Sequence, residues 1–153
     1  MKQIFLSIQN KLSEISTLKY IDKDWGQLQY DNPPVKSPCA LIDLLNIDFK
    51  QKGLGHQQAE ADIIITIANI NTVRSSSLAP QRTSAYAIFD VMEQVHQALQ
   101  LFSGNNRQFS PLMRTNIQKI PYDKDAEVYQ LTYRTSFETK KLHTPEESVN
   151  TKP

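Results

Sequence analysis

The segments ALIDLLNIDFK at Ala40–Lys50 and EADIIITIAN at Glu60–Asn69 decide the fold. Leu45, Ile47 and Phe49 alternate with polar residues, and the second segment has an apolar residue at every other position from Ala61. A period of two predicts strands with one buried face. Since two glycines lie in the intervening Lys52–His56, we expect the strands to pair as an antiparallel hairpin.

Two departures from strict alternation predict further features of these strands. Leu41, Ile42, Leu44 and Leu45 do not fit one face, which predicts a β-bulge or burial on both sides. Ile64 and Ala68 make the second face of the Glu60–Asn69 strand partly apolar. We therefore expect another part of the chain, or a partner, to cover that face.

Outside this hairpin the pattern predicts two helices and a second hairpin. Apolar residues recur with helical spacing in Lys2–Ser16 and Ala85–Phe102, and Gly104 suits the left-handed position after the second helix. The second hairpin comprises Leu112–Ile120 and Glu127–Phe137. Short strands are expected around Leu18–Ile21 and Trp25–Tyr30. In the second helix Phe89, Met92 and Leu99 are expected to face Ile63, Ile65 or Ile67.

These elements predict an α+β fold, with a mostly antiparallel sheet of about four to five strands and two helices packed on one face. Residues 1–137 are expected to form a single domain. The apolar pattern stops at Glu138, so 138–153 are expected to be a tail that is disordered or ordered by a partner.

The composition narrows the class of protein. The 153 residues contain 17 Lys and Arg against 16 Asp and Glu, a net charge of +1. That balance argues against a dedicated nucleic-acid binder. The single cysteine forbids an intrachain disulfide and, with no signal-peptide pattern at Met1–Gln9, indicates a reducing interior. No aliphatic run exceeds Ile63–Ile65, so no membrane contact is expected.

No set of residues predicts catalysis, a cofactor or a metal. Cys39 lacks a motif partner and is interpreted as a small buried side chain. His56, Glu60 and Asp62 lack zinc-site spacing, and Gly53-Leu54-Gly55 is a turn rather than a phosphate loop. Ser75–Ser77 lacks the strand–turn–helix context of a serine nucleophile. His96 borders the apolar face of its helix and is interpreted as a boundary residue rather than a catalytic one. Asp43 and Asp48 are not expected to act as paired acids, because they point to opposite faces of the strand unless a bulge intervenes. We expect no enzyme.

The polar loop Asn71–Arg82 is the main candidate for partner contact. It is longer than a strand-to-helix connection requires, and its candidate contact residues are Arg74, Ser75, Ser76, Ser77 and Arg82. Arg107 and Arg114 flank other loops and are interpreted either as solvated charge or as further contacts. Trp25 is interpreted either as a cover for the core or as an interface anchor.

The order of helix, short strand, long hairpin, polar loop, helix and second hairpin resembles the tail-terminator and tail-completion proteins of long-tailed bacteriophages. Neck and minor tail proteins of Mu-like prophages look similar. The resemblance covers residues 2–137. Its carriers are the Lys2–Ser16 helix, the sheet entry Pro34–Asp43 (PVKSPCALID), the Glu60–Asn69 strand and the Ala85–Phe102 helix.

The resemblance implies a structural protein that assembles in the bacterial cytoplasm and ends in the tail or neck of the virion. It implies a homo-oligomeric ring of about six subunits, closed in part by sheet edges. The ring caps the tail tube and joins it to the head connector, with DNA as passing cargo. Two alternatives stay open: a small-ligand binder or enzyme with its site between helix and sheet, and a monomeric adaptor for protein or nucleic acid.

Overall fold

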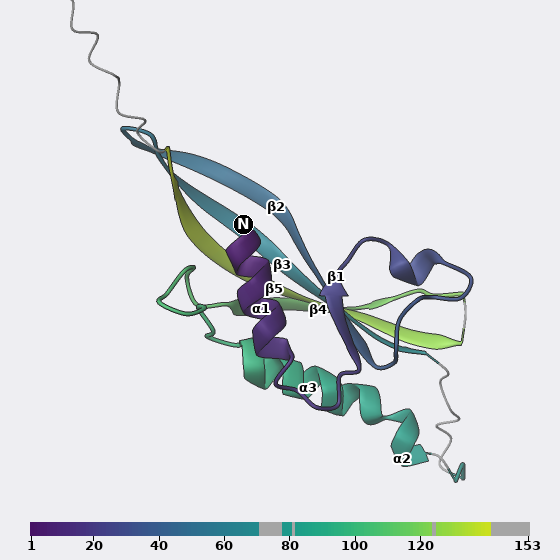
Figure 1. Cartoon of the computed structure of the whole chain (residues 1–153). Helices are drawn as coiled ribbons and strands as arrows, with labels where there is room; N and C mark the ends of the chain where they lie inside the picture. Colours follow the sequence, from purple (N-terminus) through teal and green to yellow (C-terminus); the bar gives the residue numbers. More distant parts are fainter. Residues whose placement is uncertain (71–77, 81, 124, 142–153) are drawn as a thin grey trace, which may run out of the picture.

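The computed structural model describes residues 1–70, 78–80, 82–123 and 125–141. Five strands form one sheet in the order β1-β2-β3-β5-β4: β1 (Tyr20–Lys23), β2 (Cys39–Gly53), β3 (His56–Ile70), β4 (Met113–Ile120) and β5 (Ala126–Lys140). β1 pairs with β2 in parallel, and the other neighbours are antiparallel. The expected α+β class with a mostly antiparallel sheet is confirmed (Figure 1).

Two helices, α1 (Lys2–Leu12) and α3 (Ala87–Leu99), pack on one face of the sheet, here called the helix face. Ile4, Ile8 and Leu12 of α1 are buried because they repeat every four residues. They share one core with Val95 and Leu99 of α3. The sheet contributes the following buried residues to that core: Ala40, Ile42, Ala59, Ala61, Ile63, Ile65, Ile67, Leu131, Tyr133 and Phe137.

Met92 and Leu99 are buried in this core as expected, but the prediction for Phe89 was wrong. The Phe89 side chain is 45% exposed. Its ring lies 5.7 Å from that of Tyr129 and 6.1 Å from that of Tyr86. Neighbouring helix positions lie about 100° apart, so burial of Ile88 leaves Phe89 at the margin of the packed face.

Both helices end earlier than their apolar patterns predict. α1 ends at Leu12, and the predicted Ala85–Phe102 helix is divided into α2 (Arg82–Ala85) and α3. Gln100 is extended, and Leu101, not Gly104, is the first left-handed residue, with φ 64°. The amide of Leu101 donates to the carbonyl of Leu112, at 2.9 Å. Because Leu112 directly precedes β4, this hydrogen bond ends α3 and holds the chain after it beside the start of β4.

The segment between β1 and β2 covers the other face of the sheet, here called the outer face. Cys39, Leu41, Ala68 and Val128 are buried there, against Leu28, Val35 and Tyr122. The expected strand at Trp25–Tyr30 is wrong: the structure has a 3₁₀-helix, η1 (Gln27–Gln29). Gly26 ends the extended chain with φ 89°, a conformation that favours glycine.

The expected bulge lies in β2 between Leu45 and Asp48, slightly later than the breakpoint in the pattern. Asn46 takes φ 51° within it. Asp43 pairs with Ile64 and Asp48 with Glu60, so the bulge returns both aspartates to the outer face. An odd spacing would otherwise separate them.

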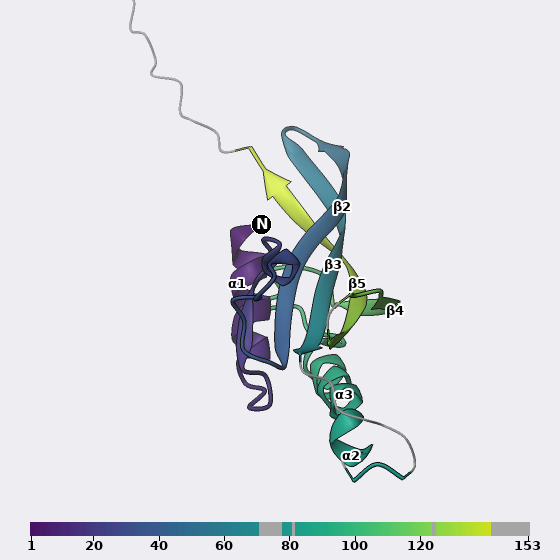
Figure 2. The same cartoon turned by 90° about the vertical axis from the view of Figure 1, so that its right-hand side faces the viewer.

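Three strands extend beyond the helices and form a feature here called the arm. It consists of Leu45–Gln58 of the β2–β3 hairpin, Glu138–Lys140 at the end of β5, and Lys141, which follows β5 (Figures 1 and 2). β5 continues three residues past its expected end, because Glu138, Thr139 and Lys140 pair with Gln58, Gln57 and His56. Backbone pairing needs no apolar pattern. Residues 142–153, most of the expected tail, lie outside the described part of the chain.

Candidate assembly surfaces

The arm exposes apolar side chains that the fold does not bury. Leu45 is 45% exposed and Phe49 is 49% exposed, on opposite faces of β2. Leu54, at the tip, is fully exposed. β1 pairs only with Cys39–Ile42, so within the described residues the β2 edge from Asp43 to Gly53 has no strand beside it. A free edge next to exposed apolar side chains is typical of a surface that pairs with another chain.

An ion-pair network links the three strands at the base of the arm. Arg134 donates to Glu60 and to Asp62, each at 3.1 Å. Lys50 contacts the other oxygen of Glu60 at 3.2 Å, and Asn46 donates to Asp62 at 3.0 Å. Hydrogen bonds from Lys50 and Arg134 lower the pKa of Glu60 below its usual value. The network orders the outer face of the arm, and it engages two of the residues first considered as metal ligands.

The arm tip is basic. Lys52, Lys140 and Lys141 are exposed, and none forms an ion pair with a described residue. The amide of Lys141 donates to the carbonyl of Gly55 at 2.9 Å, which holds the end of β5 beside the turn. The turn that carries the exposed Leu54 therefore has three lysines near it, with Glu138 as the acidic residue that shares a hollow with Leu54 and Lys52.

A hollow of about 490 Å³ lies at the opposite end of the sheet, between η1 and the β4–β5 turn. Its apolar wall includes Leu28, Ile120 and Val128, and its acidic residues are Asp24, Asp31 and Asp123. Tyr122 donates its hydroxyl to the carbonyl of Leu28, which ties the β4–β5 turn to η1. We call this feature the acidic hollow.

Trp25 lies beside the segment that forms the acidic hollow. Its side chain is 48% exposed and belongs to neither buried cluster. The indole donates to Asp22 at 3.1 Å, and its ring meets that of Tyr30 edge-on at 5.9 Å. Burial raises the pKa of Asp22, but hydrogen bonds from Trp25, Tyr20 and Lys23 outweigh it and hold the pKa below its usual value. Trp25 is thus a fixed aromatic surface, which suits an interface anchor.

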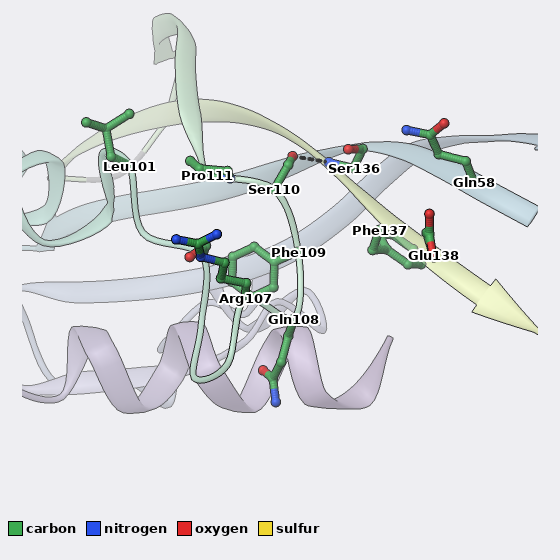
Figure 3. Close-up of a pocket in the computed structure, with 11 residues that line it drawn as sticks. Gln58, Leu101, Arg107, Gln108, Phe109, Ser110, Pro111, Ser136, Phe137 and Glu138 are labelled. Carbon is green, nitrogen blue, oxygen red and sulfur yellow. Dashed lines mark hydrogen bonds between the residues drawn. The ribbon is translucent and has the colours of Figure 1, made fainter.

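A second hollow, of about 650 Å³, lies between the base of the arm and the loop that follows α3 (Figure 3). Arg107 and Glu138 are its charged residues. Ser110 is already engaged: its hydroxyl accepts from the amide of Ser136 at 2.7 Å, and its carbonyl accepts from Thr135 at 2.7 Å. The hollow carries no set of side chains arranged for proton transfer or nucleophilic attack.

The remaining sequence candidates lie apart from one another. Cys39 is buried, and burial raises the pKa of its thiol to about 11. His96 is a partly exposed residue of α3, and its Nδ1 lies 3.3 Å from the hydroxyl oxygen of Tyr133 in β5. Burial, and then Arg114, lower the pKa of His96. Among the described residues, no three histidine, cysteine or acidic side chains are grouped to hold a metal ion.

The predicted contact loop cannot be compared with the structure. Arg74, Ser75, Ser76 and Ser77 lie outside the described residues, and Arg82 is described only as the first residue of α2. Sequence reasoning missed the arm and the acidic hollow. A signal for the arm was present: a leucine between two glycines, with lysines nearby, is unusual in a turn that only connects two strands.

Within the described residues, no helix has both the length and the apolar character needed to cross a membrane. Neither a protein-family model nor a curated protein matches the sequence. A solved structure does share the fold: a chain in the virion of a native gene transfer agent particle, with a TM-score of 0.55 and 14% identity. The likeness covers 90% of this chain and 96% of that chain. The two chains therefore have the same architecture over nearly their whole lengths.

Proposed function

We propose that this chain is a structural component of a phage-type virion. The observation that carries the proposal is the fold shared, end to end, with a chain of the gene transfer agent virion. The match covers 90% of this chain and 96% of that chain, so it supports the proposal over nearly the whole fold.

The finer proposal is a tail terminator or adjacent neck component that forms a ring of about six copies. Support comes from the surfaces of the arm. Its free β2 edge and its exposed Leu45 and Phe49 suit contacts between subunits. Trp25, half-exposed and held by Asp22, suits a contact with a neighbouring virion protein.

In this role the ring stops growth of the tail tube by covering the end of the tube. Bound to the last ring of tail-tube subunits, it covers the face to which another subunit would add, so polymerisation stops. Its opposite face then binds the head connector. The loop residues Arg74 and Arg82 would contact tube carboxylates, or phosphates of DNA passing through the lumen.

Removal of the gene from the virus or prophage that encodes the chain tests this function. A terminator is indicated by tails of unregulated length, and a neck component by tails of normal length that do not join heads. Particles with normal joined tails would contradict both roles.

The loop is tested separately by R74A/R82A, measured by counting joined particles and tail lengths. We expect fewer joined particles and a free energy of unfolding changed by no more than about 0.5 kcal/mol. Normal assembly by the double variant would remove these arginines from the mechanism. A large loss of stability would mean that they support the fold.

A further inference from the structure

The arm tip has a backbone that disfavours the residue it carries. Leu54 has φ 47°, between Gly53 with φ 95° and Gly55 with φ 78°. Leucine is disfavoured in the left-handed region, where glycine or asparagine fits without strain. Leu54 is also fully exposed, so it gains no burial within its own chain. A strained and fully exposed leucine is best explained by a contact made outside the chain.

The charges around Leu54 define the chemistry of that contact. Lys52 lies two residues before Leu54, and Lys140 and Lys141 end the neighbouring strand beside Gly55, while Lys50 is paired with Glu60. Glu138 shares a hollow with Lys52 and Leu54, so the tip has three lysines against one nearby carboxylate. A matching surface needs an apolar pocket with acidic residues around it. The acidic hollow has this character, with Leu28 and Val128 in its wall and Asp24 and Asp123 among its lining residues.

The arm tip and the acidic hollow of one chain cannot meet each other. Thr66, which lines the hollow, lies ten residues along β3 from His56 at the arm tip. At the rise of a β-strand this separation is about 33 Å. The strand is straight enough in Figures 1 and 2 to keep its ends apart. Contact between the two surfaces therefore requires a second copy.

We propose that the arm tip of one copy docks into the acidic hollow of the next. Leu54 packs against Leu28 and Val128, and the tip lysines pair with Asp24 and Asp123. The two surfaces differ, so the contact is head-to-tail, the type that closes into rings when the rotation between copies permits. The inference rests on the proposed ring and identifies the contact that builds it.

Crosslinking of variants that each carry one added cysteine tests the pairing. Gln51→Cys marks the tip without removing Leu54, and Gln29→Cys marks the hollow, while native Cys39 is fully buried. Treated with a short bismaleimide, a mixture of Q51C and Q29C should give a covalent dimer, and either variant alone should stay monomeric on a denaturing gel. Leu6→Cys, on the exposed side of α1, replaces Q29C in the control mixture. A dimer from Q51C alone would indicate a tip-to-tip contact and overturn the proposal, as would the absence of a dimer from the mixture.

Sedimentation velocity of the full chain tests the arm contact and the proposed ring independently of each other. L54D should weaken self-association at least about tenfold. K52E/K141E should weaken self-association as well, and mixing that variant with D24K/D123K should restore self-association.

If the wild-type chain forms a ring and these variants leave the ring unchanged, the proposed arm contact is wrong and the proposed ring stands. A wild-type monomer at every concentration overturns both. If K52E/K141E loses only binding to duplex DNA, the tip is a DNA contact instead.

Discussion

At the scale of single residues, burial decides what the chemically reactive groups can do. Cys39 has no exposed surface, and burial raises the pKa of its thiol from 9.0 to about 11. Tyr133 is likewise buried, and burial raises its pKa to about 12. Both groups therefore remain neutral parts of the packing at neutral pH.

Cys39 should be unreactive in the folded protein. At pH 8 the raised pKa lowers the thiolate fraction about 100-fold, and burial reduces access further. We expect labelling by an aromatic disulfide reagent to proceed only as the protein unfolds, with the denatured chain as the control. Rapid labelling of the native protein would contradict the burial of this thiol.

Alkaline pH should destabilise the fold through the same group. An unfolded thiol releases its proton above about pH 9, whereas the folded one holds it up to about pH 11. The unfolded state then binds fewer protons than the native state, so the free energy of unfolding should fall as the pH rises between these values. Chemical denaturation across this range measures the slope, and a slope of zero or above would contradict the assignment.

The α3 residues Leu99 and Phe89 should differ in their contributions to stability. Leu99 is fully buried, so L99A should cost about 2–5 kcal/mol. Phe89 keeps 45% of its surface exposed, so F89A should cost only about 1–2 kcal/mol. Denaturant unfolding of both variants tests the order, and an equal or larger loss for F89A would show that Phe89 belongs to the core.

At the scale of elements, sequence patterns predicted the strands and helices that form because one face is buried. They failed where hydrogen bonds of the backbone alone decide how far an element extends. Alternation predicted β2 and β3 because one side of each strand faces the helices. The arm tip at Gln51–Gln57 and the last residues of β5 have no such pattern, since backbone pairing rather than burial orders them. The end of α3 depends on a bond between Leu101 and Leu112, which no local pattern contains. For the same reason, reasoning about sites found the half-exposed Trp25 but not the acidic hollow, whose lining residues meet only after folding.

The arm tip should be dispensable for folding. Lys50 and Gln58 face each other in the ladder, so an Asn-Gly turn can join them in place of Gln51–Gln57. The segment contributes no buried residue, but its removal also ends the pairing of Thr139 and Lys140 with Gln57 and His56. We therefore expect the free energy of unfolding to fall by about 1–2 kcal/mol, with the core unchanged. The measurement is denaturant unfolding at a protein concentration where the wild type is monomeric. A much larger loss would show that the arm supports the core.

The C-terminal limit of the fold should be Lys141 rather than Phe137. A chain that ends at Lys141 keeps every described pair of β5 and should unfold at the full-length midpoint. A chain that ends at Phe137 loses the pairing of Glu138–Lys140 and should be less stable by about 1–3 kcal/mol. Equal midpoints for the two shortened chains would return the boundary to Phe137.

At the scale of the whole molecule, the described surface is divided into regions with different chemical character. The basic, apolar arm tip lies at one end of the sheet and the acidic hollow at the other. A chain with two different complementary ends tends to assemble head-to-tail. The proposed ring would use these two ends as the contact between neighbouring copies, and the fold shared with a virion chain is compatible with that proposal.

The mass of the purified full-length chain in solution tests that account most directly. Sedimentation velocity should be run over a wide concentration range and at two ionic strengths, because salt weakens contacts between exposed charges. We predict a single closed species of about six copies, which shifts toward smaller species at high salt. A strict monomer at all concentrations and both ionic strengths would contradict the ring.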